Sequence, residues 1–240
     1  GIMIGIGKKK EKHTPHNLLI TLIGGILVWL GWYGFNVGSA FTFDHIAMIS
    51  FVNTVIGASA GAFGWLIFEY ILKKTTSLLG LLSGALSGLV AITPAAGYVS
   101  YMSAMIIAII GGICCYIVIN LIKVKLQYND ALDAFGIHGV GGILGAVLTG
   151  VFQSHQINSA VQNGFIYTAD FKVVVIQLGA AIATVVFSAI VTFLIARFIK
   201  IFTPLATTQE EDKTGLDAIV HGEKAYFYGE LNKFNRHIKF

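Results

Sequence analysis

The 240-residue sequence contains little charge. Only 12% of its residues are Asp, Glu, Lys or Arg, whereas 55% are hydrophobic and the mean hydropathy is +0.77. A typical soluble domain has about 25% charged residues. The composition therefore excludes an ordinary soluble protein and indicates a polytopic membrane protein of the all-α class.

Cysteine is also scarce, and its placement is uninformative for folding. Cys114 and Cys115 are adjacent, so on a helix they point to different faces and form no disulfide framework. The sequence also lacks a nucleophile with its base, a metal-binding cluster, and a basic pattern interleaved with stacking aromatics. We therefore expect no enzyme, no cofactor, no metal site and no nucleic-acid partner.

Six apolar runs are long enough to span a bilayer, which takes about 20 residues each. They cover 18–41, 46–72, 77–95, 100–122, 132–152 and 173–202. Glycines recur at four-residue spacing, as in Gly57 with Gly61 and Gly84 with Gly88, and this spacing lets helix backbones approach closely. The sequence predicts a bundle of six full spanning helices within 1–204 and a separate tail at 205–240.

The basic residues gather on one side of the predicted bundle. If the helices alternate, this side holds Lys8, Lys9, Lys10, Lys12, Lys73, Lys74, Lys123, Lys125, Arg197 and Lys200, and the other side holds only Lys172. Cytoplasmic loops carry an excess of Lys and Arg. This distribution of Lys and Arg therefore predicts a multi-pass protein of the cell membrane whose tail is cytoplasmic, and it accounts for the net charge of +4 without a nucleic-acid partner.

The first residues carry a second prediction. Residues 1–7 are apolar and glycine-rich, they are followed by lysines, and no initiator methionine precedes them. A signal peptide would have its charges before the apolar stretch. We therefore expect the chain to be the later part of a longer protein.

The predicted helix 132–152 contains two ionisable residues, Asp133 and His138. An aspartate at mid-membrane costs about 2.5–3.5 kcal/mol on insertion scales, and such residues are usually functional. His138 either bonds to a neighbouring helix, with Asp133 as a possible partner, or faces a pore. Because burial disfavours the charged form, we expect a neutral imidazole that offers one donor and one acceptor, which suits a small nitrogenous solute.

The first predicted helix, 18–41, carries a second group of candidates. Ser39 is expected near the external mouth, with Phe35 one turn deeper on the same face and Trp32 about a turn below. An aromatic ring attracts a cation, and a hydroxyl oxygen accepts a hydrogen bond from it. The alternative is that these aromatics are ordinary interfacial anchors.

Other polar residues give weaker indications. Thr93 precedes a proline, which predicts a helix break that can free a carbonyl or hydroxyl toward a pathway. Glu69 is expected to form an ion pair with Lys73 or the next lysine. Asn53 and Asn120 are expected to hydrogen-bond between helices.

Five sequence motifs, spread over nearly the whole chain, resemble those of a known family. They are PHNL at 15–18, GWYGFN at 31–36 with GSA at 38–40, ITPA at 92–95, LDAFGIHGVGG at 132–142, and GLD at 215–217 with HGEKAY at 221–226. Together they resemble the Amt branch of the Amt/Mep/Rh ammonium transporter family.

The resemblance implies an eleven-helix homotrimer with one pore per subunit, of which this chain is helices six to eleven plus the tail. The substrate would be ammonium or methylammonium. Ser39 would recruit it, Phe35 would be one gate ring, Trp32 a pore wall and His138 the second histidine of a pair near which ammonium loses its proton. Asp133 would support its helix, and Thr93 remains a candidate pore residue.

The partner histidine and the second gate ring would lie before Gly1, so this chain would hold only part of the pore. The alternatives are therefore a sensor or regulatory membrane protein on the same scaffold, or a non-conducting fragment.

The tail block has an implied role of its own. Its residues are Gly215, Leu216, Asp217, His221, Gly222, Glu223 and Tyr226. By resemblance, it couples neighbouring subunits close to where a PII-type signal protein docks. From composition alone, a solvated and partly ordered tail is equally open.

Overall fold

The computed structural model describes residues 15, 17–126, 128 and 130–223. The chain divides into two units that meet within one helix, with the larger unit ending at Ile190 and the smaller one beginning at Val191. The predicted boundary between bundle and tail, 204/205, stays a prediction.

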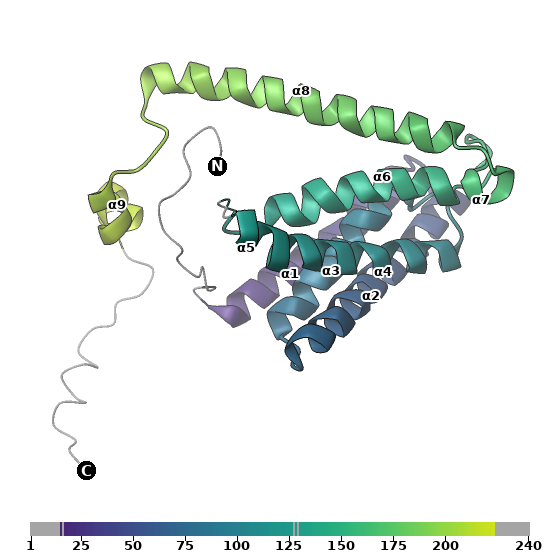
Figure 1. Ribbon diagram of the computed structural model, residues 1–240, viewed down its shortest axis with the longest axis horizontal. Helices are drawn as coiled ribbons and strands as arrows, with labels where there is room; N and C mark the ends of the chain where they lie inside the picture. The colour runs from purple at the N-terminus through teal and green to yellow at the C-terminus, as the bar shows by residue number, and fades with distance from the viewer. Residues whose placement is uncertain (1–14, 16, 127, 129, 224–240) are drawn as a thin grey trace, which may run out of the picture. The chain divides into compact units, whose positions relative to one another are not determined.

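The larger unit is built from helices in its described part (Figure 1). Its long elements are α1 (Leu18–Gly38), α2 (His45–Lys73), α3 (Leu78–Ile92), α4 (Tyr101–Ile117), α6 (Gly141–Phe152) and the first part of α8 (Lys172–Phe202). Short elements extend or join them: η1 (Thr93–Ala95), η2 (Val118–Ile122), α5 (Lys123–Leu126), η3 (Phe135–Val140) and α7 (Phe165–Thr168). Six helical segments of the described chain are long and apolar enough to cross a membrane. The predicted all-α fold with six spans is confirmed.

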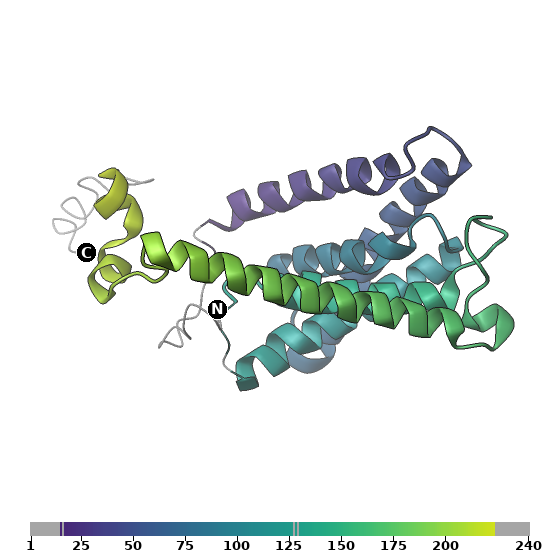
Figure 2. The same cartoon turned by 90° about the horizontal axis from the view of Figure 1, so that it is seen from above.

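Side-chain caps fix where the helices begin. The N-cap residues are Asn17 for α1, Asp44 for α2, Ser77 for α3 and Ser100 for α4. Each accepts a hydrogen bond from a backbone N–H of the first turn, which otherwise has no partner. At Asp44, the N–H of Ala47 and then the hydroxyl of Thr42 lower the pKa of the carboxyl group. The loop between α1 and α2 (Figure 2) thus ends at a charged cap.

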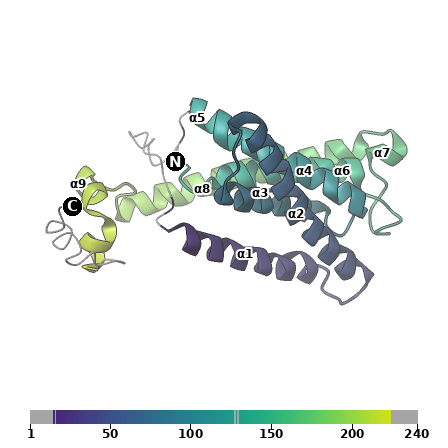
Figure 3. The same cartoon turned by 90° about the horizontal axis from the view of Figure 1, so that it is seen from below.

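Helices α2, α3 and α4 lie side by side and form the centre of the larger unit (Figure 3). A Cβ added to Gly61 would lie 2.4 Å from the Cα of Gly88, and one added to Gly112 would lie 2.2 Å from the carbonyl oxygen of Gly61. No side chain fits between backbones this close. The close approach predicted from the glycine spacing is confirmed.

Polar side chains inside the bundle behave in two ways. The Nδ2 of Asn53, on α2, donates to the carbonyl oxygens of Ala96 and Val99 at 2.8 and 2.9 Å. Both acceptors lie in the turn between η1 and α4, so the amide bonds outside its own helix but not to another helix as predicted. Asn120 instead donates to the carbonyl of Tyr116, one turn earlier on its own helix. The prediction for Asn120 was wrong because a nearby carbonyl satisfies the amide locally.

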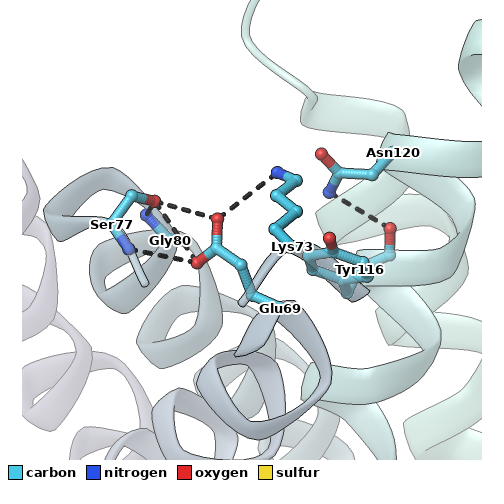
Figure 4. A network of polar contacts seen from close by, with 6 residues as sticks. All are labelled: Glu69, Lys73, Ser77, Gly80, Tyr116 and Asn120. Atoms are coloured by element: carbon cyan, nitrogen blue, oxygen red, sulfur yellow. Dashed lines mark hydrogen bonds and ion pairs between the residues drawn. The ribbon is translucent and has the colours of Figure 1, made fainter. Parts of the chain in front are cut away.

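Glu69 joins the ends of α2 and α3 (Figure 4). Its buried carboxylate lies 3.3 Å from Lys73 Nζ, which confirms the predicted ion pair, and it accepts hydrogen bonds from the backbone N–H and the hydroxyl of Ser77. The Ser77 hydroxyl oxygen also accepts from the N–H of Gly80. A carboxylate is favourable at the N-terminus of α3 because the helix dipole is positive there.

Two predicted helix boundaries were wrong. The helix expected over 132–152 begins at Phe135 with the π-helical segment η3, so Asp133 precedes it, in a left-handed conformation with φ of 56°. The helix expected over 18–41 ends at Gly38, because the chain reverses at Phe41 (φ 57°) before the Asp44 cap. The break expected at Thr93 is confirmed, since α3 gives way to the 3-10 turn η1 there.

The smaller unit contains the last part of α8, the short helix α9 (Gln209–Thr214) and the π-helical turn η4 (Asp217–His221). Thr208 and Glu211 cap the start of α9 reciprocally. Gly215 and Gly222 flank η4 with φ of 90° and 68°, a region that glycine adopts without strain. Of the predicted tail block, Leu216, Asp217, His221 and Glu223 are also described, and Tyr226 lies outside the described residues.

Candidate functional site

A pocket of about 550 Å³ lies where α1 faces the end of α3 and the start of α6. Its walls are Val28, Gly31, Trp32, Phe35, Val90, Thr93, Pro94, His138 and Gly142. Of the predicted pore residues, Trp32, Phe35, Thr93 and His138 are brought together here, from segments far apart in the sequence. Ser39 does not line the pocket.

His138 reaches the pocket from the π-helical segment η3. Its ring stacks on that of Trp32, with centroids 6.1 Å apart and an interplanar angle of 13°. The ring is exposed on the surface of the chain, contrary to the expected burial, and none of the described residues hydrogen-bonds to it. Its nitrogen atoms are therefore open to a partner in the pocket. Single π-helical turns are frequent at functional sites.

The side chains of Trp32 and Thr93 are joined by a hydrogen bond. The indole Nε1 donates to Thr93 Oγ1 at 2.8 Å, and Thr93 Oγ1 donates to the carbonyl oxygen of Leu89 at 2.7 Å. The hydroxyl has only one proton, so its donor capacity is used within the chain. Thr93 thus orients the ring against which His138 stacks.

Phe35 and Ser39 continue along α1 beyond Trp32. The Phe35 ring is 61% exposed and meets the Trp32 ring edge-on, with centroids 6.4 Å apart. Ser39 is the exposed C-cap residue of α1, and its hydroxyl donates to the carbonyl oxygen of Phe35 at 2.8 Å. Because that bond uses its proton, the Ser39 oxygen keeps its lone pairs for an external donor.

Asp133 forms its ion pair with a residue other than His138. Its carboxylate forms a 2.6 Å ion pair with Lys123 Nζ, so the alternative that pairs it with His138 was wrong. Lys123 also donates to the carbonyl of Asp130, whose carboxylate accepts from the N–H groups of Ala134 and Phe135 at 3.0 Å each. These contacts hold the start of η3.

Two of these polar residues were missed from the sequence. An aspartate shortly before an apolar helix is a capping pattern that could have identified Asp130. No comparable pattern identifies Lys123, because the connection 127–134 separates it from Asp133 in the sequence. Near this connection the pKa of the Tyr128 hydroxyl is raised, mainly by its burial and then by the charges of Asp130 and Asp133.

Comparison with known proteins agrees with this arrangement. Residues 3–226 match the Ammonium Transporter Family. The chain belongs to this family. It is 48% identical to an ammonium transporter of Bacillus subtilis over 94% of this chain and 56% of that protein, and 40% identical to one of Aquifex aeolicus over 92% and 52%. This ammonium transporter family member thus spans about half the length of its curated relatives, and it is a multi-pass membrane protein.

Solved structures of the family resemble it closely. Mep2 of Candida albicans superposes with a TM-score of 0.77 at 32% identity, covering 85% of this chain and 46% of Mep2. A structure titled Sensor Amt Protein gives a TM-score of 0.75 at 28% identity, covering 91% and 54%. The relatives of Bacillus subtilis and Aquifex aeolicus are both named ammonium transporters.

Proposed function

We propose that this chain forms one wall of a pathway that carries ammonium or methylammonium across the cell membrane, with deprotonation assisted by His138. The observation that carries the proposal is the apolar pocket in which Trp32 and His138 stack beneath Phe35. Support comes also from family membership and from the named relatives.

Recruitment is the first proposed step. Ser39 presents a hydroxyl oxygen whose proton is already donated to the Phe35 carbonyl, so it can accept a hydrogen bond from an ammonium ion. The exposed ring of Phe35 lies one turn deeper and attracts a cation through its quadrupole. Phe35 would then separate this outer position from the pocket.

Deprotonation is the second step. Carrying an intact ion through an apolar pathway costs far more than carrying a neutral amine, because the ion loses its hydration. A neutral His138 can accept the proton on a free ring nitrogen, whereas a charged one would repel the cation. Trp32 holds the imidazole plane by stacking, and Thr93 holds Trp32 through its hydrogen bond.

Assembly and regulation complete the proposal. The whole protein forms a homotrimer, and its tail lies in the cytoplasm. The block around η4, from Gly215 to Glu223, couples neighbouring subunits and lies near a docking position for a PII-type signal protein. Its support is the single turn η4, which has Gly215 before it and Gly222 after it at positive φ, and the family match, which extends to residue 226.

The substitution His138→Ala in the complete protein tests the function. We expect altered methylammonium uptake or altered ion dependence with intact trimers, because a positioned acid–base group typically contributes about 10²–10⁴-fold to a proton transfer. His155→Ala is the control, since His155 is exposed in the connection after α6, outside the pocket. Unchanged uptake in His138→Ala would remove the pore role, and a parent that forms trimers but has no uptake would favour a sensor.

The outer residues have separate expectations. Ser39→Ala should weaken the apparent affinity for methylammonium, because the acceptor oxygen is lost. Phe35→Ala should change gating, read as the concentration dependence of the current in reconstituted protein. If both variants kept parental kinetics, the recruitment step would be wrong.

A further inference from the structure

Helix α1 carries three of the proposed pathway residues but is weakly packed. Of its 21 residues, only Gly25 and Asn36 are buried. Figure 3 shows α1 along the edge of the bundle, beside α2 and α3. Its apolar side chains are mostly exposed, so packing within the chain does little to fix its rotation about its own axis. Within this chain, specific polar contacts are therefore left to fix the direction in which Phe35 and Ser39 point.

Asn36 makes such a contact with α2. Its Nδ2 donates to Thr54 Oγ1 at 3.0 Å, and both side chains are buried. Thr54 Oγ1 in turn donates to the carbonyl oxygen of Ser50 at 2.6 Å. The hydroxyl proton is thereby used, so Thr54 acts toward α1 only as an acceptor and Asn36 only as a donor. The contact has a defined direction and is shielded from solvent.

The position of Asn36 along α1 determines which part of the helix this hydrogen bond can hold. Asn36 follows Phe35 directly and lies one turn beyond Trp32, which is tied to Thr93 at the end of α3. Two successive turns of α1 are therefore tied to two different elements, one through Trp32 and one through Asn36. Two such ties, one turn apart and to different elements, restrict rotation of the helix more than either tie does alone.

We propose that Asn36 and Thr54 are a positioning pair that sets the rotation of the outer half of α1 and so holds Phe35 and Ser39 at the mouth of the pathway. This inference rests on the proposed function for its transport consequence. Its structural part, the restriction of α1, stands apart from transport. The two parts therefore have different measurements.

The test uses paired variants of the complete protein. Thr54→Val keeps the shape of the side chain but removes the acceptor, whereas Thr54→Ser keeps the hydroxyl. Asn36→Leu removes the donor. Hydrogen–deuterium exchange is measured in peptides that cover 31–38, with peptides from α2, α3 and α4 as internal references. Methylammonium uptake gives the apparent KM and the maximal rate separately.

We expect Thr54→Val and Asn36→Leu to speed exchange in 31–38 about fivefold and to raise the apparent KM about fivefold, with the maximal rate within about twofold of the parent. Thr54→Ser should behave as the parent in both measurements. Adding Thr54→Val to the double variant Phe35→Ala/Ser39→Ala should raise the KM no further than that double variant alone, because the pair acts through both residues.

The results that would contradict this proposal can be told apart from one another. Unchanged exchange in 31–38 overturns the proposal whether or not the protein transports. Faster exchange throughout α2, α3 and α4 also overturns it, because the pair would then serve general stability. Faster local exchange with an unchanged KM removes the positioning role. If the parent takes up no methylammonium, the proposed function fails, and the KM prediction fails with it, while exchange still decides whether the pair restricts α1.

Discussion

At the residue scale, the pocket is notable for how few polar atoms it leaves available. The indole N–H of Trp32 is used on Thr93, and the hydroxyl proton of Thr93 is used on Leu89. Buried polar groups are costly unless they are paired, so this mutual satisfaction keeps the wall effectively apolar. The ring nitrogens of His138 make no hydrogen bond to the described residues, whereas Thr93 Oγ1 already accepts one bond and keeps a single lone pair. A small solute in the pocket therefore finds its least occupied hydrogen-bonding group in His138.

Thr93→Val tests whether this pairing matters. The change removes the acceptor for Trp32 Nε1 and should loosen the ring on which His138 stacks. A hydrogen bond is worth about 1 kcal/mol net, or about fivefold, so we expect methylammonium uptake by the complete protein to fall by about that factor. Thr93→Ser keeps the hydroxyl and should retain parental uptake. Equal uptake in both variants and the parent would show that the orientation of Trp32 is unimportant.

Residue types were easier to predict than residue partners. His138 and Trp32 could be identified from the sequence because a histidine in an apolar run is unusual and the surrounding blocks are specific. Thr93 was correctly placed at a helix break, but whether its hydroxyl faced a solute or the protein depended on Trp32, 61 positions away. Asn36 lay inside a recognised block and received no role, since its partner Thr54 belongs to the next helix.

At the element scale, the long helices follow from composition and the irregular turns do not. An apolar run of about 20 residues has to satisfy its backbone internally in a bilayer, so α2 and α8 could be predicted almost to their ends. The π-helical segment η3 could not, because its local sequence also suits a regular helix. Contacts with the preceding connection, chiefly from Lys123 and Asp130, fix where η3 begins.

The close approach of α2 and α3 at their glycines can be tested by comparing two glycine substitutions. In Gly61→Ala the new methyl group would lie 2.4 Å from the Cα of Gly88, so the helices would have to separate. Overpacking of this kind costs about 1–3 kcal/mol, and we expect a lower melting temperature for the detergent-solubilised protein. Gly24→Ala is the matched control, because a methyl group there meets no atom within 4 Å. If both variants melt like the parent, the helices are not packed this closely.

At the scale of the whole molecule, the connections of the larger unit fall at two ends. The turn after α2 carries Lys73 and Lys74, at the start of α3. The connection after α6 lies at the other end of α3, because the N–H of Ser154 donates to the carbonyl oxygen of Tyr98 at 2.9 Å. The turn with Lys73 and Lys74 and the connection after α6 therefore lie at opposite ends of α3 within the larger unit. The positive-inside rule predicts that the end with Lys73 and Lys74 faces the cytoplasm.

Cysteine labelling in intact cells checks this orientation. Thr76, between α2 and α3, and Ser159, after α6, are both exposed, and each is replaced singly by cysteine. We expect a membrane-impermeant maleimide to label Ser159→Cys in intact cells and Thr76→Cys only after permeabilisation. The parent is the background control, since Cys115 is buried and Cys114 half-buried on the spanning helix α4. The opposite labelling pattern would invert the topology. Ser39 lies at the same end as Ser159 if the helices alternate, so it would then face the cytoplasm. In that position Ser39 could not recruit external ammonium.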